Sequence, residues 1–156
     1  MCIVVDTLPV RQPVLGVTVM VDKIYVLRKK NEDEIEVYDS ATFSLDRFIS
    51  VPKETKLGLV DIASSAQYVC LYLAYNAAQC VLQMDVEGHS MHRWEVNDEP
   101  SNLSVNADNN ILVTCPVARK IKEFSSDGDL LREIELPSDV VNPLHALQLS
   151  SRRRIT

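Results

Sequence analysis

The chain has 156 residues, of which 46% are hydrophobic and 24% charged, enough for one globular domain with an apolar core. Its 16 Lys and Arg residues against 22 Asp and Glu residues give a net charge of -6. That balance excludes a chain whose whole surface attracts a phosphate backbone, so DNA is not an expected partner. No apolar run approaches the roughly 20 residues that cross a bilayer, and the first residues lack the basic start of a secretory signal. We therefore expect a cytoplasmic protein without a membrane segment.

Residues 1–13 are expected to be a lead-in, and strand-like runs begin after them. The first four runs, of average strand length and separated by short polar turns, are 16–21, 23–28, 34–39 and 44–51. Similar sets of four return at 59–64, 69–75, 80–86 and 90–96, and at 101–106, 110–115, 120–125 and 130–136. A run at 145–150 matches the first strand of a further set, and a basic tail follows at 151–156.

The sets are in register. Matching first-strand positions, Val19, Ile62, Leu103 and Leu147, are separated by 43, 41 and 44 residues. A period near forty with four strands per unit is typical of β-propeller blades. We therefore predict an all-β fold, with four-stranded antiparallel meanders as the blades of an incomplete six-bladed propeller and with Trp94 between two blades. A β-sandwich, which also has short strands at regular spacing, is the alternative. The partial propeller would cover 14–150, with blades at about 14–52, 58–97 and 100–137 and a fourth starting at 143.

A family resemblance rests on specific stretches. The unit "IEVYDSATFSLDRFI", preceded by "KIYVL", resembles the NHL repeat, and "PSNLSVNADNNILVT" is similar to that family's first and second strands. The resemblance covers about 14–150. It implies a six-bladed β-propeller, as in the C-terminal propellers of tripartite-motif ubiquitin ligases, and it implies proteins or structured RNA as partners. The function it favours is a non-enzymatic protein-protein interaction module, with a role in substrate recognition by ubiquitin ligases.

Binding in a propeller is expected on its loops. The links between blades and the loops between second and third strands share one face around the channel, here called the link face; the remaining turns form the opposite turn face. We expect partner-binding residues on the link face: Arg28, Lys29, Lys30, Tyr75, Asn76, Asp98, Glu99, Asn102, Arg119, Lys120, Asn142 and His145. Their mixed charges favour a protein partner. Tyr75, taken as the exposed aromatic candidate, keeps an RNA-binding propeller as the alternative.

Catalytic motifs are not found in the sequence, so we predict no enzyme, no cofactor and no metal site. A second alternative is a metal-dependent propeller hydrolase, in which Glu99, Asn102, Asn142 and His145 would offer oxygen and nitrogen ligands. The cysteines lack zinc-ligand spacing, and the apolar surroundings of Cys70 and Cys115 indicate buried thiols. Three blades and one strand do not close a ring, which predicts a homo-oligomer or missing C-terminal blades.

Overall fold

The computed structural model describes residues 13–29, 34–52 and 58–140. Within these ranges the regular secondary structure is β-strand alone, so no helix there could cross a membrane. The first sheet consists of β1 (Val14–Met20), β2 (Lys23–Arg28), β3 (Glu34–Asp39) and β4 (Leu45–Ser50). The second consists of β5 (Leu59–Ser65), β6 (Cys70–Tyr75), β7 (Cys80–Asp85) and β8 (Ser90–Glu95). The third consists of β9 (Asn102–Val105), β10 (Ile111–Cys115), β11 (Lys120–Phe124) and β12 (Leu130–Glu135).

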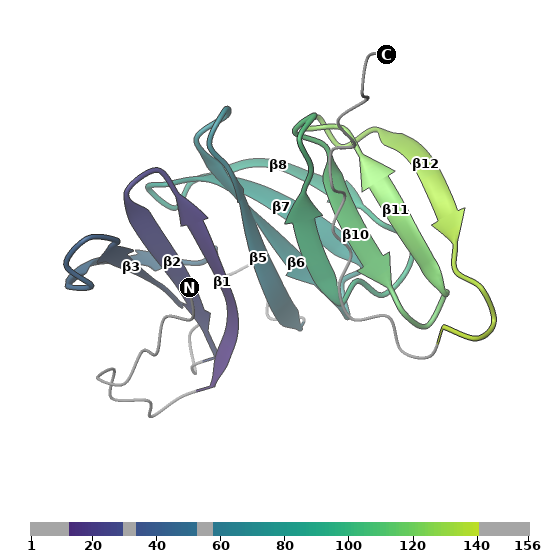
Figure 1. The fold of residues 1–156 in the computed structure, drawn as a ribbon, viewed down its shortest axis with the longest axis horizontal. Helices are drawn as coiled ribbons and strands as arrows, with labels where there is room; N and C mark the ends of the chain where they lie inside the picture. Colours follow the sequence, from purple (N-terminus) through teal and green to yellow (C-terminus); the bar gives the residue numbers. More distant parts are fainter. Residues whose placement is uncertain (1–12, 30–33, 53–57, 141–156) are drawn as a thin grey trace, which may run out of the picture.

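Each sheet is an antiparallel meander in which neighbours in sequence are neighbours in space, in the orders β1-β2-β3-β4, β5-β6-β7-β8 and β9-β10-β11-β12. The first strands β1, β5 and β9 lie side by side, and the other strands extend outward from them (Figure 1). This arrangement confirms the predicted all-β fold of propeller blades. The predicted run at 145–150, the lead-in and the basic tail lie outside the described residues.

Polar side chains at the ends of third strands explain why the chain turns where it does. Asp39 Oδ1 accepts the backbone N–H groups of Ala41 and Thr42, both at 3.0 Å. Asp85 Oδ1 does the same for Glu87 and His89 at 2.9 and 2.8 Å. These short side chains replace strand pairing with a local turn, as Asp and Asn commonly do. Asp39 and Asp85, which end β3 and β7, are therefore turn formers.

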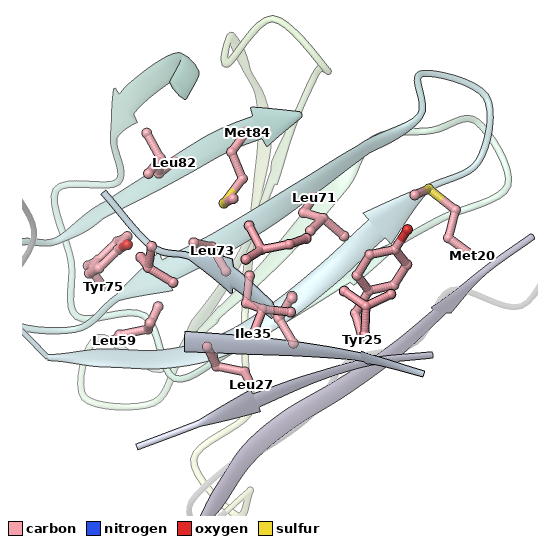
Figure 2. Packing of buried hydrophobic residues seen from close by; sticks show 14 of the residues in the cluster. Met20, Tyr25, Leu27, Ile35, Leu59, Leu71, Leu73, Tyr75, Leu82 and Met84 are labelled. Carbon is pink, nitrogen blue, oxygen red and sulfur yellow. The ribbon is translucent and has the colours of Figure 1, made fainter. Parts of the chain in front are cut away.

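The first and second blades bury a shared apolar layer. Side chains alternate along a strand, so Leu27 and Ile35 point toward the second sheet while Leu71 and Leu73 point toward the first (Figure 2). All four are fully buried. Each such side chain stabilises the fold by roughly 1.5–3 kcal/mol relative to an exposed one. Contact between blades, and not any single sheet, therefore provides the core.

The second and third blades pack around aromatic rings. The Trp94 ring lies 6.0 Å from that of Tyr72 in an edge-to-face arrangement and 6.1 Å from that of Phe124. Because Phe124 belongs to the third sheet, this confirms that Trp94 lies between two blades. Cys70 and Cys115 are fully buried in the same layer, as predicted.

Candidate functional site

The inner strands carry a hollow of about 290 Å³. It is lined by residues 17–19 of β1, 61–64 of β5 and 103–105 of β9. Val17 and Val19 are exposed at its β1 side, whereas Ile62 and Leu103 are buried. In a propeller, the innermost strands form the wall of the central channel. The hollow is therefore a stretch of that wall with mixed apolar and polar lining, shared by three blades.

A buried carboxylate fastens the wall across the blade boundaries. Asp61 Oδ2 accepts hydrogen bonds from the Leu103 backbone N–H at 2.8 Å and from Asn102 Nδ2 at 3.4 Å. On the other side, a Cβ at position 16 would lie 2.5 Å from Asp61 Oδ1, so only Gly16 leaves room for this carboxylate. Hydrogen bonds to a charged acceptor are stronger than neutral ones. Asp61 thus positions β5 against both β1 and β9.

Hydrogen bonds also join neighbouring blades near the channel mouth on the turn face. Thr18 Oγ1 and Ser64 Oγ lie 2.7 Å apart, and Ser64 Oγ donates to the Val19 carbonyl at 3.3 Å. Asn109 Nδ2 donates to Gln67 Oε1 at 2.7 Å, which links the turn after β9 to the turn after β5. Hydrogen bonds therefore link β1 to β5 near their ends on the turn face, and they link the turn after β5 to the turn after β9.

On the link face, three of the predicted binding residues have internal partners. Arg28 is buried, and its Nε lies 2.7 Å from Glu36 Oε2. Tyr75 is fully buried in the layer between the first and second blades (Figure 2), so its prediction as an exposed aromatic is wrong. Asn76 is half-buried and donates from Nδ2 to the Pro100 carbonyl at 3.0 Å. Each of these side chains contributes to the fold.

Two predicted charges, Asp98 in the second link and Lys120 at the start of β11, are paired within the chain. Asp98 Oδ2 lies 2.7 Å from Lys122 Nζ, and Lys120 Nζ lies 3.0 Å from Glu133 Oε2. Burial opposes the charge of Lys122, but hydrogen bonds to Asp98 and Glu133 outweigh it and raise its pKa. Lys122 therefore stays protonated and ties the second blade to the third.

The other predicted link-face residues differ in exposure and in their side-chain partners. Asn102 is half-buried and contacts Asp61, while Arg119 is exposed and donates from Nη2 to the Pro137 carbonyl. Lys29 and Glu99 are exposed, and no side-chain partner is seen for either within the described ranges. Lys30, Asn142 and His145 lie outside the described residues. Their predicted roles in partner binding stay predictions.

Buried thiols account for the described cysteines. Burial raises the pKa of the Cys115 thiol to about 11, and it also raises the pKa of Cys80. Because the thiolate is the nucleophile and the metal ligand, neither thiol is activated at neutral pH. In the part of the chain that the structure describes, no three His, Cys, Asp or Glu side chains are grouped to hold a metal ion.

The turn face holds side chains that the sequence reading passed over. Large apolar side chains at its turns are exposed: Val21, Phe43, Tyr68 and Val69. Three of them also have left-handed backbone angles, with φ of 56° at Val21, 56° at Phe43 and 49° at Val69. Phe43 and Tyr68 lie between predicted strand-like runs, where turns usually carry Gly, Asn, Asp or Ser, so their size is a signal that could have marked them; Val21 and Val69 fall within predicted runs and carry no such signal.

Comparison with solved structures agrees with this geometry. The chain is similar to hydrazine synthase from Kuenenia stuttgartiensis, with 16% identity, a TM-score of 0.64, and coverage of 92% of this chain and 41% of that one. It is similar to virginiamycin B lyase from Staphylococcus aureus, with 16% identity, a TM-score of 0.63, and coverage of 87% and 45%. It is also similar to BamB from Moraxella catarrhalis, with 9% identity, a TM-score of 0.59, and coverage of 81% and 38%.

These neighbours are β-propeller proteins, and identities this low show the fold alone. The chain spans less than half the length of each of these three neighbours. No family model matches the sequence, and no curated protein sequence matches it. The chain therefore has the β-propeller fold.

Proposed function

We propose that the chain is a non-enzymatic protein-binding module with an NHL-type propeller. The observation that carries the proposal is the set of large apolar side chains exposed on turns of one face: Val21, Phe43, Tyr68 and Val69. Turns on a rigid β-scaffold are common positions for binding residues. Exposed apolar side chains on turns of one face offer contact area to a protein partner.

The scaffold under these turns favours binding because little has to be ordered when a partner arrives. The Asn109 to Gln67 hydrogen bond fixes the turns after β5 and β9 relative to one another, and the Thr18 to Ser64 pair fixes β1 against β5. A preformed surface avoids part of the entropy loss that accompanies association. A side chain such as Tyr68 adds contact area with few rotatable bonds.

The two faces differ in how their side chains are used. On the link face, Asp98 and Lys120 already have charged partners in the chain, whereas Lys29 and Glu99 extend into solvent. We therefore propose that the turn face is the main contact surface. The exposed charges of the link face would contribute a weaker electrostatic attraction to the partner. By analogy with NHL propellers, the proposal includes recognition of a ubiquitin-ligase substrate in the cytoplasm.

The test starts from the purified chain, immobilised and exposed to a nuclease-treated cell extract. We expect a discrete protein to be retained, and the same protein, once purified, to bind the chain saturably in calorimetry. A paired variant, Val21→Asn with Val69→Asn, is compared with Lys29→Glu and Glu99→Lys. A larger loss of affinity in the valine variant supports a site on the turn face. A larger loss in the Lys29 and Glu99 variants places the site on the link face. Retention of RNA alone, or calcium-dependent hydrolysis of small esters, contradicts a non-enzymatic protein-binding function.

A further inference from the structure

The channel mouth on the turn face carries a narrower feature, here called the turn rim, made of Val19, Val21, Asp22, Tyr68, Val69 and Asp108. We propose that the turn rim binds an extended protein segment whose centre is apolar and whose two flanks are basic. This inference rests on the proposed function and adds the chemistry of the partner. Three blades contribute to the rim through the turns after β1, β5 and β9. These turns follow the inner strands, which lie side by side (Figure 1).

The middle of the rim is apolar. Val21 is 72% exposed, Val19 60%, Val69 52% and Tyr68 43%, although side chains of this size are usually buried. Val19 also lines the hollow over the inner strands, so the rim and the hollow are continuous. At about 290 Å³, the hollow is at the lower limit of the roughly 300–1,000 Å³ typical of small-molecule pockets. It suits one or two anchoring side chains of a larger partner better than a free small molecule.

Turn geometry does not account for the valines. Val21 and Val69 have φ of 56° and 49°, and a β-branched residue is less stable than glycine in this conformation. The third blade has Asn109 at the position equivalent to Val69, with φ of 60°, and Asn tolerates this conformation well. The backbone alone would favour Asn or Gly at all three positions. The strained valines therefore provide exposed apolar surface at a cost in stability, which is a common trade in binding sites.

Carboxylates stand at both ends of the apolar stretch. Asp22 follows Val21 in the turn after β1, and Asp108 lies in the turn after β9, on the far side of Tyr68 and Val69. Both are exposed, and neither forms an ion pair with a described residue. Complementary charges at a contact steer encounter and exclude partners of the wrong sign. Two separated carboxylates with valines and a tyrosine between them match a segment with basic flanks and an apolar centre.

The test uses three synthetic peptides and the full 156-residue chain. One peptide has a Leu-Val-Leu centre with lysines on both sides, one has the same centre with glutamates, and one has a serine centre with lysines. We expect the first to bind at least about tenfold more tightly than the others, a difference of about 1.4 kcal/mol. Its affinity should fall as salt rises, because the flanking contacts are exposed. NMR shifts should concentrate at the turns after β1 and β5.

Variants separate binding from folding. The double change Val21→Asn and Val69→Asn relieves the left-handed strain, so it should leave stability unchanged or higher while it weakens the first peptide at least about tenfold. Val117→Ser is the matched control, because Val117 is 78% exposed in a turn of the link face. Asp22→Asn with Asp108→Asn should weaken binding mainly at low salt, and Glu99→Gln should not.

Several outcomes would overturn the inference. Equal binding of all three peptides, or an unchanged affinity in the double valine variant, removes the turn rim as the site. Loss of self-association in that variant, without peptide binding, would make the rim a contact between copies of the chain. If a captured protein binds the double valine variant normally, the proposed function stands and this inference fails. If no protein binds either form while the lysine-flanked peptide does, the rim chemistry stands and the proposed function fails.

Discussion

Glu123 shows how one residue joins strand, turn and charge in the third blade. It is buried in β11, and its Oε1 accepts hydrogen bonds from Asn106 Nδ2 at 3.0 Å and Asn110 Nδ2 at 2.9 Å. Its Oε2 accepts from Arg132 Nε on β12. Burial alone would raise the pKa of this carboxyl, but the donors from Asn110, Arg132 and Asn106 lower it below the ordinary 4.5. The charged form is therefore the one that the fold stabilises.

The lowered pKa of Glu123 sets a direction for the pH dependence of stability. Because the pKa is lower in the folded chain, its contribution is complete above the ordinary value of 4.5 and is lost as pH falls through the folded pKa. We expect Glu123→Gln to lower the free energy of unfolding at neutral pH by about 1–3 kcal/mol, since Arg132 and two amides lose a charged acceptor. The difference from the wild-type chain should shrink in acid.

Urea unfolding at neutral and at acid pH measures this effect. Glu135→Gln is the comparison, because Glu135 is an exposed carboxylate on the adjacent strand β12. An equal loss of stability from both substitutions, or a difference for Glu123→Gln that persists in acid, would show that the hydrogen-bonded carboxylate is not the cause.

Individual side chains were harder to predict from the sequence than strands. Tyr75 stands beside a turn, which favoured exposure, yet strand alternation puts it on the same side of β6 as Leu71 and Leu73. Arg28 ends a strand and is followed in sequence by two lysines, but its charge is buried against Glu36. Period-two alternation could have identified Tyr75. The Arg28 contact depends on pairing between β2 and β3 that local sequence does not reveal.

At the scale of elements, the strands follow from the sequence and the turn conformations follow only in part. Twelve predicted runs match the twelve strands, because alternating apolar residues and short polar turns recur with a fixed period. The turns between third and fourth strands have a left-handed residue in every blade: Phe43, Gly88 and Gly128. Glycine is expected in that conformation, but Phe43 is not. The identity of Phe43 does not indicate a positive φ. Glycines in the equivalent turns of the other two blades could have indicated it.

Gly128 gives a prediction for the boundary between the second and third blades. A Cβ there would lie 2.8 Å from Trp94 Cδ2, and its φ of 87° disfavours any side chain. We expect Gly128→Ala to destabilise the chain by about 1–3 kcal/mol, because it adds an atom to a packed site with a left-handed backbone. The clash should also displace the indole and shift Trp94 fluorescence to the red.

Gly88→Ala provides a matched control. Gly88 occupies the equivalent turn of the second blade with a φ of 95°, but its Cβ would meet Ile49 Cγ2 at 3.0 Å and not Trp94. Both changes should lower stability in urea unfolding, while only Gly128→Ala should move the emission of the folded state. The same red shift from both would mean that Trp94 reports general loosening and not this contact.

At the scale of the whole molecule, the blades are unequal in burial. Every residue of β6 is buried, because the second blade is packed between the first and the third. Every residue of β12 is exposed, and three of them are large and apolar: Leu130, Leu131 and Ile134. An outer strand has unpaired backbone groups along one edge, and apolar side chains there favour pairing with another chain. The most buried strand, β6, and the strand most suited to pairing with another chain, β12, therefore lie in adjacent blades.

We predict that the chain associates with itself through β12, in keeping with the homo-oligomer expected from its repeats. In hydrogen exchange, amides of β6 should exchange slowest at every concentration, and amides of β12 should become protected only as concentration rises. Leu131→Lys should abolish that protection and shift the chain to monomer in light scattering, because a charge on an edge strand opposes pairing. Met91→Lys, at a similarly exposed position of the outer strand β8, is the control and should leave association intact. A chain that stays monomeric at high concentration, or that responds equally to both substitutions, contradicts a contact through β12.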